Sequence, residues 1–151
     1  MGHASIAIQR RIEWSDTDAS GHYHNTAAFR MFEWAETALF EALGILQDVY
    51  GRLPRAHIRA DFKGLLWHRD IVEIELRVKE LGASSITYDI EIRRGPDTCI
   101  AAVVVAVLVG AGRRPERWSD EYRELLLSAG PQPAERLVSD IVGASEQTGT
   151  T

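Results

Sequence analysis

Apolar and polar residues alternate at the start of the chain. Between Ser5 and Trp14 every second residue is apolar, and the alternation is out of phase only at Arg10. This period of two predicts a half-buried β-strand. The strand leads into residues 15–21, a run of turn-forming residues that ends in Gly21.

Residues 26–43 form the most informative segment. Asn25 is a good N-cap and Gly44 a good stop signal, so the spacing predicts a helix that ends near Leu43. Its polar side chains fall on one narrow stripe, which Glu36 widens: Thr26, Arg30, Glu33, Thr37 and Glu41. A helix that is apolar around most of its circumference must be enclosed. We therefore expect other elements to wrap this helix.

Four later segments have the patterns of β-strands. They span residues 56–63, 72–81, 85–93 and 98–109. The last is almost entirely apolar and rich in β-branched residues, as is typical of a central strand covered on both faces. Glycine-containing turns at 82–83 and 95–97 predict hairpins, so the sheet should be mainly antiparallel. The pattern predicts an α+β fold in which five strands form a curved antiparallel sheet around one long helix.

The C-terminal part is less regular. A short helix is expected at Asp120–Ser128, with Ser119 as its cap and acidic residues in its first turn. A second short helix is expected at residues 134–142, followed by a flexible tail. The total of 151 residues fits one domain. We expect a single domain over 1–130 and a C-terminal extension over 131–151.

Composition narrows the possible roles. The chain has 17 basic and 22 acidic residues, a net charge of -5, which argues against binding nucleic acid. One cysteine, Cys99, cannot form an internal disulfide. The longest apolar run, 99–109, is shorter than the roughly 20 residues that span a bilayer. The first residues do not resemble a secretory signal, so we expect a cytoplasmic protein that does not enter a membrane.

Polar, titratable residues concentrate at the junction between the first strand and the long helix. Asp16, Asp18, His22 and His24 lie within nine positions, and Asn25 follows. The free N–H groups at a helix N-terminus favour negative charge and could hold the developing oxyanion of an acyl carbonyl. A carboxylate from the turn could attack that carbonyl or deprotonate a water. We expect Asp18 to take this role and the helix dipole to help keep it ionised.

Simpler interpretations stay open for the same residues. An aspartate in such a turn commonly bonds only the nearby backbone, Asn25 could be only a helix cap, and Asp16 could merely orient the loop. Two histidines beside two aspartates could also bind a metal, although their order matches no familiar metal site. Glu33 and Glu36 are most simply solvated or interfacial, but a helix carboxylate could reach a neighbouring active site.

At this point the sequence resembles a known family. The segment IEWSDTDASGHYHNTAAFRMFEWAE, residues 12–36, is similar to the signature of hotdog-fold thioesterases of the 4-hydroxybenzoyl-CoA thioesterase type. Their pattern is aromatic-x-D-x-D-x-x-G-H/V-x-x-N followed by a helix. Counterparts also exist for residues 59–66, for the strand opening at Asp70 and for the 82–85 hairpin, so the resemblance covers about Ile6 to Val109.

The resemblance implies a sheet curled around a central helix and dimers or tetramers with active sites at the subunit interface. It implies no metal and no cofactor. The family's catalytic aspartate, a nucleophile or general base, matches Asp18, and the residue whose N–H polarises the thioester carbonyl matches Asn25. In this interpretation His24 or His22 would position water or substrate, and His24 and Phe29 would lie beside the reacting group.

Some positions depart from the family pattern. Many relatives have Val-Asn or Val-Tyr in place of Tyr23-His24, and Tyr in place of Phe29. Some members bind CoA phosphates with a basic cluster near the 82–85 hairpin, where this chain offers only Ser84 as a substrate-binding candidate. The phosphate contacts are therefore not transferable, and an acyl-carrier-protein substrate stays possible beside acyl-CoA.

The expected function is hydrolysis of an acyl-CoA or acyl-carrier-protein thioester to a free acid and a thiol. Two alternatives stay open. One is a hotdog module that binds an acyl group without turnover, and the other is a hotdog dehydratase or hydratase, which pairs a helix carboxylate with a histidine. A pocket lined by Phe29, Phe32 and Trp67 would suit aromatic or medium aliphatic acyl groups, but the sequence does not identify the acyl chain.

Overall fold

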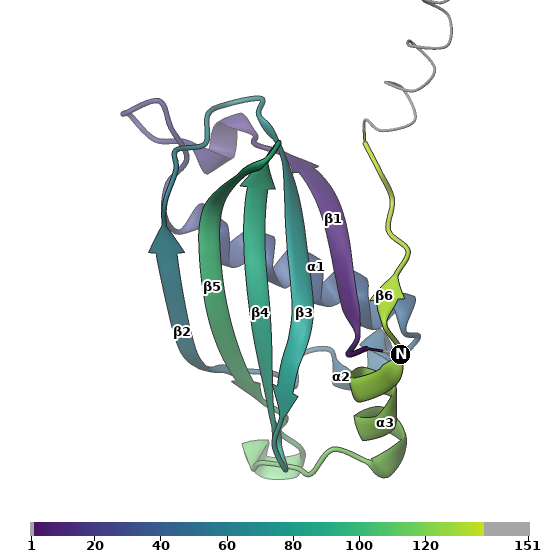
Figure 1. Cartoon of the computed structure of the whole chain (residues 1–151). Helices are drawn as coiled ribbons and strands as arrows, with labels where there is room; N and C mark the ends of the chain where they lie inside the picture. The colour runs from purple at the N-terminus through teal and green to yellow at the C-terminus, as the bar shows by residue number, and fades with distance from the viewer. Residues whose placement is uncertain (1, 138–151) are drawn as a thin grey trace, which may run out of the picture.

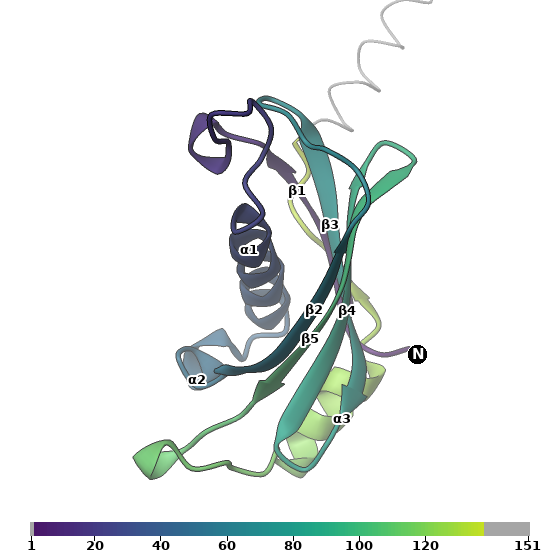
Figure 2. The ribbon, with the colours of Figure 1, turned by 90° about the vertical axis from the view of Figure 1, so that its left-hand side faces the viewer.

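A curved sheet packed against one long helix forms the protein (Figures 1 and 2). The structure is a computed structural model that describes residues 2–137. The strand order is β2-β5-β4-β3-β1-β6. The strands span these residues: β1 Ser5–Arg11, β2 Arg55–Phe62, β3 Ile71–Leu81, β4 Ser85–Arg94, β5 Asp97–Val107 and β6 Pro131–Gln132. The expected α+β hotdog architecture is confirmed, with five antiparallel strands and one short additional strand.

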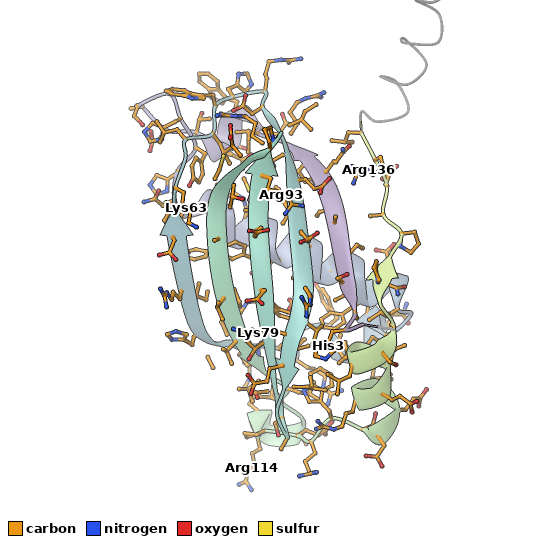
Figure 3. All side chains as sticks on the ribbon, in the orientation of Figure 1. His3, Lys63, Lys79, Arg93, Arg114 and Arg136 are labelled. Carbon is orange, nitrogen blue, oxygen red and sulfur yellow. The ribbon has the colours of Figure 1, made fainter. Side chains whose placement is uncertain are left out.

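The sixth strand was not expected, because two residues carry no readable alternation. β6 pairs in parallel with the start of β1, opposite Ser5 and Ile6. The chain then continues beside the same strand, where the Leu137 N–H donates to the side chain of Gln9 and Arg136 pairs with Glu73 of β3 (Figure 3). The C-terminal segment therefore covers the β1 edge of the sheet.

Helix α1, Ala27–Ala42, lies across the concave face of the sheet (Figure 2). Its buried residues face the strands: Ala27, Ala28, Met31, Phe32, Ala35, Leu39 and Phe40. Burying one large apolar side chain contributes about 1.5–3 kcal/mol, so this face is the main attachment of the helix. Gly44, in the left-handed region at φ 76°, ends the helix as expected. The cap residue is Thr26 and not Asn25, which was expected in that position.

The sheet covers only one side of α1. On the opposite side Phe29 exposes 43% of its surface, and Glu33, Thr37 and Glu41 are exposed as well. The expected wrapping of the helix by the sheet is confirmed on its apolar face, and Glu33, Thr37 and Glu41 belong to the polar stripe. Phe29 is the large apolar residue of the helix that was not expected to be exposed. One sheet of this curvature can bury a single face of a helix, and covering the other face would require a second molecule.

The far end of the sheet is closed by short elements. Helix α2, Leu46–Val49, follows α1 directly, and helix α3, Asp120–Ser128, lies beside the β3–β4 turn. α3 was predicted at these residues, and the Ser119 hydroxyl accepts the Tyr122 N–H at 3.1 Å as a cap should. α2 has a single turn and was not predicted.

Two earlier expectations concern the chain after β6. Residues 133–137 contain no helix, and the rest of the helix expected at 134–142 lies outside the described residues, as does the expected tail. Among the residues that the structure describes, no helix is long and apolar enough to cross a membrane.

A polar contact inside the core joins three elements. The Glu36 carboxylate on α1 accepts the hydroxyl of Tyr88 on β4 at 2.6 Å and a guanidinium N–H of Arg55 on β2 at 2.7 Å. Tyr88 is completely buried, and burial followed by the Glu36 charge raises its pKa well above the usual value. Burial would lower the pKa of Arg55, but Glu36 outweighs that effect and raises it. Glu36 therefore fixes the edge strand β2 to the helix, contrary to the expectation that it is solvated or interfacial.

We predict that Tyr88→Phe lowers the free energy of unfolding by about 1–3 kcal/mol, because a buried hydrogen bond to a charged group is lost while the ring stays in place. Urea denaturation measures the change. Tyr50→Phe is the matched control, since Tyr50 is 77% exposed and should tolerate loss of its hydroxyl. Equal stability of the two variants would show that the Tyr88–Glu36 bond does not stabilise the fold.

Candidate active site

The junction between β1 and α1 folds as a small hairpin over residues 16–24. The His24 N–H donates to the Asp16 carbonyl at 2.7 Å, Thr17 forms a β-bridge with Tyr23, and the Asp18 N–H donates to the His22 carbonyl at 3.2 Å. Gly21 closes the turn at φ 90°, a value that glycine adopts without strain. The hairpin lies at the end of the sheet where β3 begins (Figure 1).

Asp16 anchors the hairpin to the helix. Its side chain is only 3% exposed, with one carboxylate oxygen bound to Arg30 of α1 at 2.5 Å and the other to the Glu13 N–H at 2.9 Å. Both oxygens are therefore committed to structural partners. This agrees with the interpretation in which Asp16 orients the loop.

Asp18 lies at the tip of the hairpin and is exposed. One carboxylate oxygen, Oδ1, accepts both the N–H and the hydroxyl of Ser20, and the other oxygen has no hydrogen-bond partner among the described residues. The two Ser20 hydrogen bonds, with smaller contributions from His22 and His24, lower the pKa of Asp18 below the ordinary aspartate value. The expected ionised state thus has a local cause in Ser20, which sequence reasoning missed although an Asp-x-Ser turn commonly forms such bonds.

His22 occupies the second arm of the hairpin beside an exposed tryptophan. Its Nδ1 contacts the Tyr23 carbonyl at 3.0 Å, and because a carbonyl only accepts, Nδ1 must carry the proton. In the neutral ring Nε2 is then an acceptor. The imidazole and the Trp67 indole meet at 90° with centroids 5.7 Å apart.

Nearly all backbone N–H groups at the start of α1 already donate to nearby acceptors. The Thr26 N–H donates to Nδ1 of His24 at 3.2 Å, and the N–H groups of residues 27, 28 and 29 donate to the carbonyls of residues 24, 25 and 26. Between His24 and Phe29, only the Asn25 N–H has no acceptor among the described residues. His24 thus supplies the capping contact that was expected of Asn25.

A small cavity of about 180 Å³ has Asn25 in its lining. Its lining comes from the hairpin, the helix entry and the loop after β2: His22, Tyr23, Asn25, Phe62, Lys63, Gly64 and Leu65. Lys63 stands at the end of β2 (Figure 3). Burial raises the pKa of Tyr23 to about 12, so its hydroxyl stays protonated and is no base at neutral pH. The cavity thus offers hydrogen-bond donors to an acyl oxygen.

The structure brings some predicted site residues together and separates others. His22 and Asn25 share the cavity, whereas Asp18 does not line it but lies opposite His22 in the hairpin, with its N–H bound to the His22 carbonyl. Phe29 meets Phe32 edge-on with ring centroids 6.1 Å apart, and Phe32 is buried in the core, whereas Trp67 lies beside His22 of the hairpin. The expected pocket of Phe29, Phe32 and Trp67 stays a prediction.

Ser84 lies at the opposite end of the sheet. It precedes β4 in the β3–β4 turn, which the length of β3 places roughly 30 Å from the 16–24 hairpin (Figure 1). A substrate bound at Asn25 would meet Ser84 only if a second chain supplied it. Within residues 2–137, no three His, Cys, Asp or Glu side chains gather closely enough to hold a metal ion.

Comparison with known proteins gives a consistent picture. The family model of the thioesterase-like superfamily matches residues 12–126. A candidate esterase of Aquifex aeolicus (strain VF5) is 26% identical over 84 residues, which are 53% of this chain and 66% of that protein. The aligned part therefore spans just under two thirds of this relative.

Solved structures share the fold. A variant of 4-hydroxybenzoyl-CoA thioesterase, solved with 4-hydroxybenzoyl-CoA, has a TM-score of 0.72 at 23% identity and covers 81% of this chain and 98% of its own. A Thermus thermophilus thioesterase, solved with coenzyme A and zinc, has a TM-score of 0.73 at 21% identity over 80% of this chain and 90% of its own. These likenesses establish the hotdog fold.

The two hairpin aspartates should respond differently to the same substitution. In Asp16→Asn one of the two donors, Arg30 or the Glu13 N–H, must face an amide N–H₂, so we predict a loss of about 1–3 kcal/mol of stability. In Asp18→Asn the amide oxygen can still accept both Ser20 bonds, so stability should stay near wild type. Thermal unfolding of both variants measures the difference, and equal losses would refute the anchoring role of Asp16.

Proposed function

The chain belongs to the thioesterase-like superfamily, and from this we propose that it hydrolyses the thioester of an acyl-CoA or acyl-carrier-protein to a free acid and a thiol. The observation that carries the proposal is the single uncommitted N–H at the entry of α1, at Asn25, beside a cavity. The proposal includes a cytoplasmic location.

In this proposal the Asn25 N–H binds the carbonyl oxygen of the thioester. As the carbonyl carbon becomes tetrahedral, its oxygen gains negative charge, and a fixed donor stabilises that charge more than it stabilises the ground state. The neighbouring N–H groups cannot compete, because each is bonded within the turn. The positive end of the α1 dipole adds to the effect.

Asp18 supplies the attacking or proton-accepting group. Its carboxylate is ionised at neutral pH, and the Ser20 hydrogen bonds lower its pKa further. Within residues 2–137, its side-chain hydrogen bonds are to Ser20 of its own turn alone. Rotation away from Ser20 directs the carboxylate along the hairpin towards His22. It then attacks the thioester carbon, or accepts the proton of a water that His22 Nε2 helps to position. Direct attack by Asp18 expels the thiolate and leaves an acyl–aspartyl anhydride, which water hydrolyses to the free acid and the Asp18 carboxylate. In the general-base route the water oxygen adds to the carbonyl carbon, the thiolate leaves, and the thiolate takes up the proton that Asp18 accepted.

The alternatives have less support. A dehydratase would need a helix carboxylate paired with a histidine, but the buried candidate, Glu36, is bound to Arg55 and Tyr88. No histidine contacts it among the described residues. A module that binds without turnover would not require the ionised Asp18 or the free donor at Asn25.

We further propose that the active form is a homodimer or a homotetramer. The outer edge of β2 has no strand partner within residues 2–137, and the strand is eight residues long. Such an open edge pairs readily with another chain. In that assembly a second chain would cover the exposed side of α1. It would also add walls to the cavity at Asn25, whose 180 Å³ is far below the 300–1,000 Å³ typical of ligand pockets.

The direct test is hydrolysis of a panel of acyl-CoA and acyl-carrier-protein thioesters, with release of thiol as the readout. We predict that Asp18→Asn lowers kcat by at least roughly 10²-fold, in line with the loss of a general base or nucleophile. Asp89→Asn, on the outer face of β4, is the matched control. Binding without thiol release by the wild type would favour the module, and an active Asp18→Asn would remove Asp18 from the mechanism.

The role of Ser20 makes a separate prediction about pH. A lowered pKa keeps Asp18 charged into acidic solution, so the acid limb of kcat/KM should lie below the ordinary aspartate range. In Ser20→Ala the hydroxyl hydrogen bond, the largest cause of the lowered pKa, is lost while the backbone N–H bond stays. The pKa of Asp18 therefore rises, and the acid limb moves to higher pH. The pH profile of both proteins measures the shift, and an unchanged limb would mean that Asp18 is not the titrating group.

A further inference from the structure

A second surface at the hairpin end of the sheet has no role in the proposed reaction. Trp14 and Tyr50 each expose 77% of their surface, the largest fraction among the large apolar side chains of the described residues. Its ring meets His68 at 87° with centroids 5.8 Å apart. Such a T-shaped contact covers at most one face of the indole, so a broad aromatic surface faces solvent.

Arg69 lies next to this pair in an unusual backbone conformation. The Asp70 N–H donates to the Trp67 carbonyl at 3.0 Å, which closes a four-residue turn with Arg69 at its third position and φ at 76°. A turn with a positive φ only at that position is of type II and favours glycine. An arginine there is strained, and strain of this kind concentrates at functional sites.

The turn is braced so that it cannot relax. The Asp70 carboxylate accepts the Trp67 N–H at 2.9 Å and an Arg94 N–H at 3.0 Å, while the Arg69 N–H donates to the Ile12 carbonyl at 2.8 Å. The side chain of Arg69 itself makes no hydrogen bond or ion pair with any described residue. A rigid turn thus holds an exposed guanidinium, without a partner among the described residues, one position after His68, whose ring contacts Trp14.

We propose that Trp14, His68 and Arg69 bind the nucleotide end of coenzyme A. The adenine base stacks on the Trp14 indole, and the Arg69 guanidinium pairs with a phosphate of the 3′-phosphorylated adenosine diphosphate. Stacking of a base on an aromatic side chain and pairing of Arg with phosphate are the interactions that these two chemical groups favour. The inference rests on the proposed thioesterase function, and it selects CoA over a carrier protein.

The position of the surface fits a substrate that reaches the reacting groups. The Trp14 carbonyl accepts the Thr17 N–H at 3.1 Å and the Thr17 hydroxyl at 2.7 Å, so Trp14 lies one tight turn before Asp18. Trp67, the first residue of the Arg69 turn, contacts His22. The pantetheine arm of CoA can therefore pass from this surface along the hairpin to the cavity at Asn25.

A nucleotide is a better occupant than a second copy of the chain. A subunit interface gains from broad apolar area, whereas here one aromatic face stands beside an unpaired cation and a histidine. The Arg69 guanidinium, which has no ion pair with a described residue, supplies the charge that a phosphate group pairs with.

Calorimetry with CoA and with adenosine 3′,5′-bisphosphate tests the binding directly, without any need for turnover. Trp14→Ala should weaken the binding of both ligands by at least about fivefold, the lower limit for loss of one stacked base. Tyr50→Ala, which removes an equally exposed ring at the other end of α1, should leave both affinities unchanged. Equal affinities of Trp14→Ala and wild type would overturn the proposal.

Arg69→Gly provides a second test with opposite effects on stability and binding. Glycine relieves the left-handed strain, so Tm should stay the same or rise, while CoA affinity falls and the loss shrinks at high salt because a charge pair is involved. Arg113→Gly is the matched control, since Arg113 also has a positive φ, 57°, but it follows β5 and stands next to Arg114, at the opposite end of the sheet (Figure 3). A fall in Tm without loss of affinity would make Arg69 purely structural.

Steady-state kinetics separate this inference from the proposed function. For acyl-CoA, Trp14→Ala and Arg69→Gly should raise KM and leave kcat unchanged, and for the matching acyl-pantetheine both constants should stay at wild-type values. If the wild type hydrolyses both substrates with equal kcat/KM, the nucleotide surface is refuted while the thioesterase function stands. A wild type that hydrolyses neither refutes the function, and calorimetry still decides whether the surface binds CoA.

A change of oligomeric state in Trp14→Ala would assign Trp14 to a subunit interface and overturn the proposal.

Discussion

The packing of α1 into the concave face of the sheet is the constraint from which the site follows. The buried face of the helix and the inward residues of β1, β3, β4 and β5 form one continuous core. Because this core fixes the axis of the helix, it also fixes its N-terminus beside the end of the sheet where β3 begins. The Asp16–Arg30 ion pair then ties the 16–24 hairpin to the same helix. The hairpin that carries Asp18 is therefore positioned by residues that take no part in chemistry.

The hydrogen bonds at the helix start explain why one position stands out. Backbone N–H groups at a helix N-terminus lack partners within the helix, and a buried one without a partner is unfavourable. Here His24 and three tight backbone bonds satisfy the groups from Thr26 to Phe29, so a single donor stays available at Asn25. A fixed donor that is not spent on the fold is what an oxyanion site needs, because it is already oriented before the charge develops.

Sequence patterns predicted the regular elements well, because periods of 2 and 3.6 residues report directly which face is buried. The bounds of α3, and those of α1 within one residue, could be predicted from the sequence, as could the five main strands. The capping role of His24 could not, since an N-cap asparagine is the commoner solution. Glu36 was misread for a similar reason: it extends a polar stripe, and only the tertiary structure places Tyr88 and Arg55 against it. The family resemblance suggested both Asp18 and Ser84 as site residues, but within one chain the antiparallel strands place them at opposite ends of the sheet.

Three local features that do not stabilise the fold lie at the hairpin end of the molecule. A solvent-exposed Trp14, an arginine at a glycine position and an unused N–H at Asn25 each cost stability or leave a favourable interaction unmade. The core lies below them and does not depend on any of the three. Arg113 is the other non-glycine residue with positive φ among those described, and it stands alone at the far end. Isolated strain of that kind is ordinary in a loop, whereas three such features around one hairpin are expected where binding and chemistry take place.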